Sequence, residues 1–78
     1  MNTHIENDQI AVISRILIEE FEKTPYRKAA ERILAAGLTS EHLLAYGNTA
    51  TGRMIPDPQK VNTFNAMRDL ELGIKVRD

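Results

Sequence analysis

The side chains best suited to catalysis or metal binding are two histidines, His4 and His42. A metal site in a protein uses about four ligands at suitable spacing. Neither histidine belongs to an H-E-x-x-H motif or to another such cluster. His42 and its neighbour Glu41 could exchange protons with a substrate, but no nucleophile is positioned beside them. We therefore expect two solvent-exposed histidines, and we predict no enzyme, no catalytic residue, no metal site and no cofactor.

A second chemical candidate is the segment from Gly47 to Met54, which reads G-N-T-A-T-G-R-M and has the glycine spacing of a phosphate-binding loop. Such a loop ends in Gly-Lys-Ser or Gly-Lys-Thr, follows a strand and leads directly into a helix. Here Arg53 replaces the lysine and Met54 replaces the hydroxyl residue. We reject nucleotide binding and interpret the glycines as parts of a flexible surface loop.

A cluster of carboxylates lies near the end of the first expected helix: Glu19, Glu20 and Glu22. Carboxylates are mildly unfavourable at a helix C-terminus, by up to about 1 kcal/mol. The basic residues that follow directly could neutralise them: Lys23, Arg27 and Lys28. We favour a solvated, locally paired surface, and the functional alternative is a charged contact with a partner.

Nucleic-acid binding needs a separate test, because residues 24–47 have the proportions of a helix-turn-helix motif. The second helix of that motif reads base edges with Arg, Lys, Asn or Gln, but the helix expected after Thr39 contains no Arg or Lys. The formal net charge of −1 supplies no general basic field either. Nucleic acid is therefore a less favoured partner than protein. Four basic side chains could contact it: Arg27, Lys28, Arg32 and Arg53.

The elements that must position these residues are helices, because apolar residues recur at spacings of three and four. The first helix is expected over residues 8–23, with Asn7 or Asp8 as its N-cap. Its β-branched runs leave a buried strand as the rival interpretation, which its length disfavours. Residues 1–7 are expected to be frayed.

Three further helices are predicted from residue types that begin or end helices. Each expected start has a capping residue, and two have a proline where no amide hydrogen is needed: Thr24 with Pro25, Thr39 or Ser40, and Asp57 with Pro58. Gly37 and Gly73 supply left-handed ends for the second and the last helix. Residues 47–57 are expected to form an irregular loop.

The first helix carries more apolar surface than one packing face needs. One stripe of its residues is expected to face the core: Ile10, Ile13, Leu17 and Phe21. Ala11 and Ile18 lie on a separate flank, with Arg15 between them. The last two helices have narrower or drifting stripes, whose candidate buried residues are Leu43, Leu44 and Tyr46, then Val61, Phe64, Met67 and Leu70.

Chain length limits the core that these helices can build. A domain of 78 residues buries only about 60% of its unfolded surface. The sequence has no cysteine, so disulfides and thiolate metal sites cannot add stability, whereas oligomerisation can. We predict an all-α fold: one domain over residues 1–78, a small bundle of about four helices completed by a homodimer. The predicted partner interface consists of Ala11, Arg15 and Ile18.

Two stretches carry a resemblance to known families. Residues 26–36, Y-R-K-A-A-E-R-I-L-A-A, are similar to the Y-R-x-A-A-R-x-x-L-x-A segments of many small phage and prophage proteins. Residues 56–73, P-D-P-Q-K-V-N-T-F-N-A-M-R-D-L-E-L-G, resemble the helix that follows the DNA-binding part of phage terminase small subunits. No basic reading helix precedes the second stretch here. The resemblance implies a phage-encoded accessory protein and transfers no functional residue.

The sequence supports two hypotheses of function. The first is a non-enzymatic helical module that binds a protein partner, as a phage-type accessory or regulatory protein, and forms a homodimer. The alternative is a small helix-turn-helix-like DNA-binding regulator or DNA-packaging adaptor. The N-terminus lacks the basic region of a signal peptide, and no apolar run approaches the roughly 20 residues that a membrane span needs. We therefore expect a cytoplasmic protein with no membrane contact.

Overall fold

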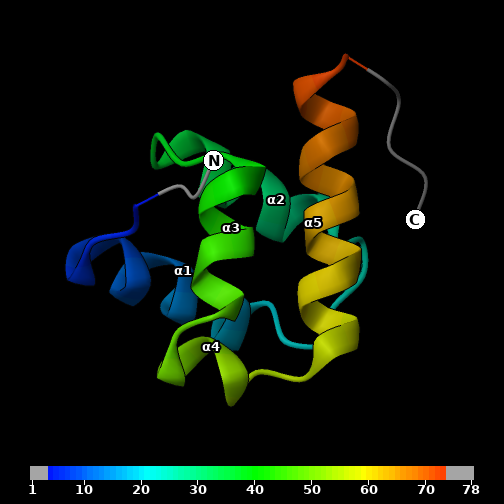
Figure 1. The fold of residues 1–78 in the computed structure, drawn as a ribbon. Coiled ribbons are helices and arrows are strands. Elements are labelled where there is room, and N and C mark those ends of the chain that lie inside the picture. The colour runs from blue at the N-terminus through cyan, green and yellow to red at the C-terminus, as the bar shows by residue number, and fades with distance from the viewer. Residues whose placement is uncertain (1–3, 74–78) are drawn as a thin grey trace.

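The structure, a computed structural model, describes residues 4–73 as five helices without a strand. The helices are α1 (Asn7–Glu19), α2 (Arg27–Ala35), α3 (Ser40–Gly47), α4 (Ala50–Arg53) and α5 (Asp57–Glu71). α2 packs against α1 and α5, and α3 packs against α1, α4 and α5. Figure 1 shows α3 between α1 and α5, with α4 at the lower end of the bundle. The predicted all-α bundle is confirmed, with one helix more than expected.

α1 is shorter than predicted at its C-terminal end. A capping box begins it, in which the Glu6 amide donates to Oε1 of Gln9 at 2.9 Å. Ile13 and Leu17 are fully buried, as predicted. The helix ends at Glu19, so Phe21 lies beyond it with 40% of its surface exposed. The prediction that Phe21 continues the core stripe is wrong, because helical spacing no longer applies after the last turn.

The start of α2 lies later than predicted. Thr24 and Pro25, joined by a cis peptide bond, precede the helix, and Tyr26 takes the N-cap position. The prediction of Thr24 as N-cap and Pro25 as first helical residue is therefore wrong. The connection between α1 and α2 is hydrogen-bonded to Gln59 of α5, and these tertiary contacts outweigh a local capping preference.

The end of α2 matches the prediction. Gly37 has a φ of +84°, the left-handed conformation that a side chain disfavours. This turn lets the Leu38 amide donate to the Ile33 carbonyl at 3.3 Å and the Gly37 amide donate to the Leu34 carbonyl at 2.9 Å. Leu38 is buried against the core. A single glycine therefore ends the helix and returns the chain toward the core.

The segment expected to be an irregular loop, residues 47–57, contains α4. The Thr49 hydroxyl donates to the Tyr46 carbonyl at 2.7 Å and accepts from the Gly52 amide at 2.9 Å, so one side chain joins the end of α3 to the start of α4. A Cβ built at Gly52 would lie 1.9 Å from the Tyr46 carbonyl oxygen. Gly52 is a glycine because α3 and α4 approach closely, not because it binds phosphate.

α5 buries a face that differs from the predicted stripe. It begins at Asp57, after Pro56 as N-cap and with Pro58 in its first turn, and the chain turns at Gly73 with a φ of +74°. The buried residues of α5 are Gln59, Thr63, Ala66 and Met67, whereas Phe64 and Leu70 are half-buried. Val61 is 54% exposed. The prediction of Val61 in the inward-facing stripe is wrong, because Gln59 and Thr63 are the buried residues here and Val61, two positions from each, lies on the opposite side of the helix.

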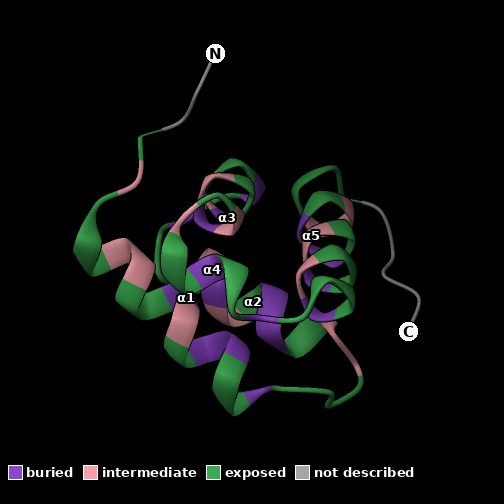
Figure 2. Cartoon of the chain, turned by 60° about the horizontal axis from the view of Figure 1, so that its bottom comes forward, coloured by how far each residue is buried: buried purple, intermediate pink, exposed green. Residues whose placement is uncertain are grey.

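The core lies between α1, α2, α3 and α5. Figure 2 shows the buried residues on the inward faces of the helices. The largest fully buried side chains come from every helix except α4: Tyr46, Ile13, Leu17, Ile33, Met67 and Thr63. Leu43 is buried next to Tyr46, but Leu44 is 62% exposed. The prediction that Leu44 is buried is wrong, because the inward face of α3 carries Ser40, Leu43 and Tyr46, and Leu44 lies beside that face.

Candidate protein interaction surfaces

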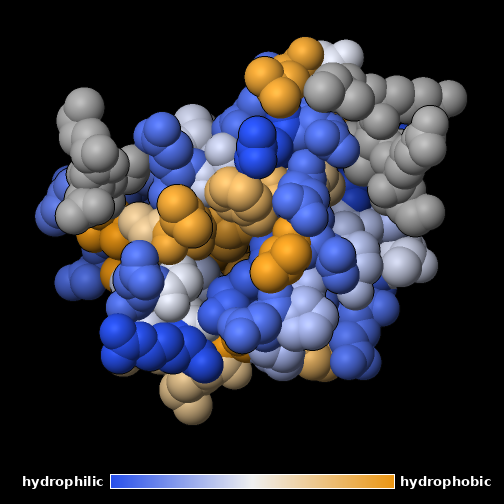
Figure 3. All heavy atoms as spheres, turned by 45° about the vertical axis from the view of Figure 1, so that its right-hand side comes forward, coloured by the Kyte–Doolittle hydropathy of each residue, from blue (hydrophilic) through white to orange (hydrophobic). Residues whose placement is uncertain are grey.

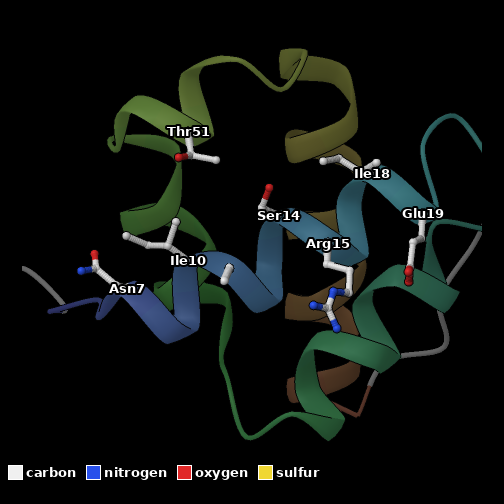
Figure 4. Close-up of a pocket in the computed structure, with 8 residues that line it drawn as sticks. Asn7, Ile10, Ser14, Arg15, Ile18, Glu19 and Thr51 are labelled. Carbon is white, nitrogen blue, oxygen red and sulfur yellow. The ribbon is translucent and has the colours of Figure 1, made fainter.

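The first candidate surface is the outer side of α1. Ala11, Arg15 and Ile18, the predicted partner interface, are all exposed, and Ile18 exposes 60% of its surface. Together with Ile10 and Ser14 they form what we call the α1 flank. It lines a shallow groove of about 550 Å³ whose other wall includes Thr51 of α4, and Figure 4 shows Thr51 across from α1. The structure brings all three predicted residues onto one surface.

The α1 flank lies on a helix that is held firmly from behind. Ile13, Ile16 and Leu17 are 0%, 4% and 0% exposed. A side chain such as Ile18 therefore projects from a backbone that is already ordered. Binding to such a surface costs little additional conformational entropy.

Arg15 is the charged member of the α1 flank. Within the described residues 4–73 it takes part in no ion pair or hydrogen bond with another side chain. Arg32, by contrast, contacts Glu19 at 2.6 Å and Glu20 at 3.1 Å. Of these two arginines, Arg15 has its guanidinium available to a partner.

The second candidate surface is a groove between α3 and α5, which we call the α3–α5 groove. Its volume is about 260 Å³, and its lining residues are Leu43, Leu44, Gly47, Asn48, Asp57, Lys60, Val61 and Phe64. Leu44 and Val61 expose 62% and 54% of their surfaces. Figure 3 shows hydrophobic side chains gathered in a hollow on this face. The sequence does not indicate this surface, because Leu44 and Val61 belong to apolar stripes that were expected to face the core.

Two charged residues of opposite sign lie in the wall of the α3–α5 groove. Nζ of Lys60 donates to the Gly52 carbonyl at 3.0 Å and lies 3.2 Å from Oδ1 of Asp57. The Lys60 side chain is only 15% exposed, whereas that of Asp57 is 87% exposed. The lysine is turned toward α4, so the charge that this end of the groove presents to solvent is the carboxylate of Asp57.

The four basic residues proposed for nucleic-acid contact are not equally free. Arg27 lies 3.7 Å from Glu31, and Arg32 bridges Glu19 and Glu20. The hydrogen bond to Glu19 raises the pKa of Arg32. Lys28 and Arg53 are exposed and form no ion pair within the described residues.

The acidic cluster is neutralised by a different residue than predicted. Lys23, Arg27 and Lys28 follow the cluster in sequence, but Arg32 of α2 contacts Glu19 and Glu20. The prediction of paired carboxylates is confirmed for Glu19 and Glu20, but the predicted cations are wrong, and Glu20 is buried instead of solvated. Packing of α2 against α1 decides the pairing, because it places the Arg32 guanidinium beside both carboxylates.

The two histidines have ordinary surroundings. His4 is exposed. His42 is half-buried, and its Nδ1 accepts the Thr39 amide at 3.0 Å, which completes the capping of α3. Residues 4–73 contain no group of three or more potential metal-binding side chains. His42 thus has a structural role, the capping of α3, that its residue type and position in the sequence alone did not indicate.

Two polar residues of α5 bind backbone groups of distant segments. Nε2 of Gln59 donates to the Glu20 carbonyl at 3.1 Å, and its Oε1 accepts the Glu22 amide at 2.9 Å. The Glu71 carboxylate accepts from the Ser40 amide at 2.9 Å and from the Ser40 hydroxyl at 2.7 Å. These contacts join the two ends of α5 to α1 and α3. No local pattern predicts them, because each links residues more than 30 positions apart.

Comparison with known proteins adds no relative. No family model, no curated protein and no solved structure matches this chain. No helix in the described part of the chain is long and apolar enough to cross a membrane. The resemblance to phage proteins therefore depends only on the residues that carry it.

Proposed function

We propose that this chain is a non-enzymatic helical protein–protein interaction module, of a phage-type accessory or regulatory kind, that self-associates through the α1 flank. A homodimer is the smallest such assembly. The observation that carries the proposal is the two-sidedness of α1: Leu17 is fully buried while its neighbour Ile18 is 60% exposed. Ile18 lies beside Ile10 and Ala11 in a groove. A partner that covers this exposed aliphatic side chain removes apolar surface from water, which favours association.

Ile18 supplies a modest part of the free energy of association. Burying an isoleucine side chain fully contributes about 1.5–3 kcal/mol, so the exposed part of Ile18 alone supplies about half of that on association. The rest must come from neighbouring apolar contacts and from Arg15, which has no partner among the described residues. Such a contact is weak without additional surface, as is usual for reversible assembly.

DNA binding as a regulator or packaging adaptor is the alternative. Of the four basic side chains that could contact DNA, Arg27 and Arg32 form ion pairs with carboxylates of the same chain. Lys28 and Arg53 remain for phosphate contacts, and two such contacts give weak, salt-sensitive binding. Gel-shift titration on duplex DNA at two salt concentrations tests this alternative. A shift at low salt that disappears when Lys28 and Arg53 are replaced by alanine would favour it over the first proposal.

The test of the first proposal is the molar mass of the purified chain in solution, measured by light scattering over a range of concentrations. We expect the wild type to exceed one copy at high micromolar concentration and Ile18→Glu to remain monomeric. Leu72→Glu is the matched control, because Leu72 is 65% exposed but belongs to neither surface. A wild type that stays monomeric, or an Ile18→Glu chain that assembles as the control does, contradicts the proposal.

A further inference from the structure

We propose that the α1 flank of one copy docks into the α3–α5 groove of a second copy, so that this chain assembles head to tail. The inference rests on the proposed self-association and names the surface that the α1 flank binds. It differs from a symmetric contact, in which two α1 flanks would face each other. Three observations carry it: apolar complementarity, charge, and the positions of the two surfaces.

The apolar parts of the two surfaces complement each other. The α1 flank projects an aliphatic side chain, Ile18, from a firmly held helix. The α3–α5 groove is concave, with a volume of about 260 Å³, and is walled by Leu44, Val61 and Phe64. Docking an amphipathic helix face into an apolar groove between helices is a recurrent mode of protein recognition.

Charge distinguishes this arrangement from the symmetric one. Arg15 lies between Ala11 and Ile18, so a two-fold axis through the middle of the flank would bring two Arg15 side chains together. Like charges placed opposite each other at an interface disfavour that pairing. In the head-to-tail contact, Arg15 instead meets the groove that contains Asp57, whose side chain is 87% exposed. Arg15 and Asp57, whose carboxylate also lies 3.2 Å from Nζ of Lys60, then form an ion pair across the contact.

The positions of the two surfaces allow both to be used at once. They share no residue, and Figure 1 shows α1 and α5 on opposite sides of α3. A copy whose flank is docked therefore still offers its groove. Contacts of this kind continue until a ring closes or a filament forms.

Mixing two variants tests the arrangement. Ile18→Glu places a carboxylate on the α1 flank and leaves the α3–α5 groove unchanged. Val61→Glu places a carboxylate in the groove and leaves the flank unchanged. Each alone is expected to be monomeric, and their equimolar mixture is expected to form a one-to-one heterodimer and nothing larger. The wild type is expected to grow beyond two copies as its concentration rises. Sedimentation velocity measures all four samples, with Leu72→Glu as the control that should behave as the wild type.

The outcomes separate this inference from the proposed function. If Val61→Glu assembles as the wild type does while Ile18→Glu does not, the flank pairs with itself; self-association stands and the head-to-tail contact is overturned. If the wild type is monomeric, both fail. Circular dichroism must show native helix content for each variant, and Leu44→Glu replaces Val61→Glu if that chain unfolds, since Leu44 is 62% exposed.

A charge exchange provides an independent measurement. Arg15→Asp and Asp57→Arg are each expected to weaken assembly, about tenfold in the association constant. Combined in one chain, they restore the ion pair in reversed order and should recover most of the loss. A double variant that is no better than either single one overturns the contact between Arg15 and Asp57.

Discussion

The α1 flank and the α3–α5 groove are both exposed and apolar, but they are built in different ways. The flank comes from one helix, and its residues follow helical spacing from Ala11 through Arg15 to Ile18. The groove exists only because the packing of α3 and α5 places Leu44 and Val61 around one cavity. A surface formed by one element is visible in the sequence, whereas a surface formed between elements depends on how they pack. Four predictions test how far the two surfaces are independent of the core and of each other.

The largest contrast is expected between two adjacent residues of α1. Leu17→Glu places a carboxylate at a fully buried position and should cost at least about 4 kcal/mol, most of the stability of a domain this small. Ile18→Glu alters a position that is 60% exposed and should change stability by no more than about 0.5 kcal/mol. Urea denaturation followed by circular dichroism, at a concentration that keeps the chain monomeric, measures both. Equal losses would show that the flank is not separate from the core.

The next prediction concerns α4, which contacts both surfaces. It supplies Thr51 to the wall opposite the α1 flank and the Gly52 carbonyl to Lys60 in the α3–α5 groove. Gly52→Ala should destabilise by about 3 kcal/mol, because its Cβ would meet the Tyr46 carbonyl oxygen at 1.9 Å.

Gly47→Ala is the control for Gly52→Ala. Its Cβ would meet only Cδ of Lys60, at 4.0 Å, so we expect unchanged or slightly higher stability, by up to about 1 kcal/mol. Thermal denaturation compares the two variants. Similar melting temperatures for Gly47→Ala and Gly52→Ala would refute the close contact between α3 and α4.

A smaller loss is expected for Gln59→Ala. Gln59 joins α5, which forms one wall of the groove, to the end of the helix that carries the flank. Its removal leaves the Glu20 carbonyl and the Glu22 amide without these hydrogen bonds, at a cost of about 2 kcal/mol. Hydrogen exchange should show faster exchange of the Glu22 amide. Asn62→Ala, on the exposed side of α5, should change stability by less than about 0.5 kcal/mol, and an equal effect there would contradict the role of Gln59.

The smallest effect concerns Tyr46 of α3, whose hydroxyl is buried without a hydrogen-bond partner. Burial raises the pKa of Tyr46, and the nearby Ser14 hydroxyl of the α1 flank offsets part of the rise. A tyrosine pKa that is higher in the folded than in the unfolded state adds to the free energy of unfolding. This contribution is fully present below the unfolded-state pKa of about 10 and is lost as the pH rises through the folded-state pKa.

Tyr46→Phe isolates that effect. At neutral pH we expect a change of at most about 1 kcal/mol, toward higher stability, since an unpartnered buried hydroxyl is lost. Above about pH 10 the variant should lose less stability than the wild type. Urea denaturation of the wild type and of Tyr46→Phe at neutral and alkaline pH measures the difference. Tyr26, the other tyrosine, is present in both chains and does not contribute to the difference. Identical pH dependence would show that Tyr46 ionises freely in the folded protein.

Local signals predicted the helices better than their ends. Gly37 and Gly73 adopt the left-handed conformations expected of them, and Thr39 begins α3 as predicted. Thr24 and Pro25 carried an equally strong local signal, yet α2 begins after them. The difference is tertiary, because hydrogen bonds from Gln59 hold the chain that leads into α2.

By itself, the sequence determined the all-α fold, the buried pair Ile13 and Leu17, and the exposure of Ile18 on the same helix, because these depend on spacing within one element. Only the tertiary structure decided that Arg32 pairs with Glu19 and Glu20, and that Leu44 and Val61 form the walls of a groove. The physical reason is that helical periodicity defines which residues share a face, whereas the relative packing of helices decides what covers that face.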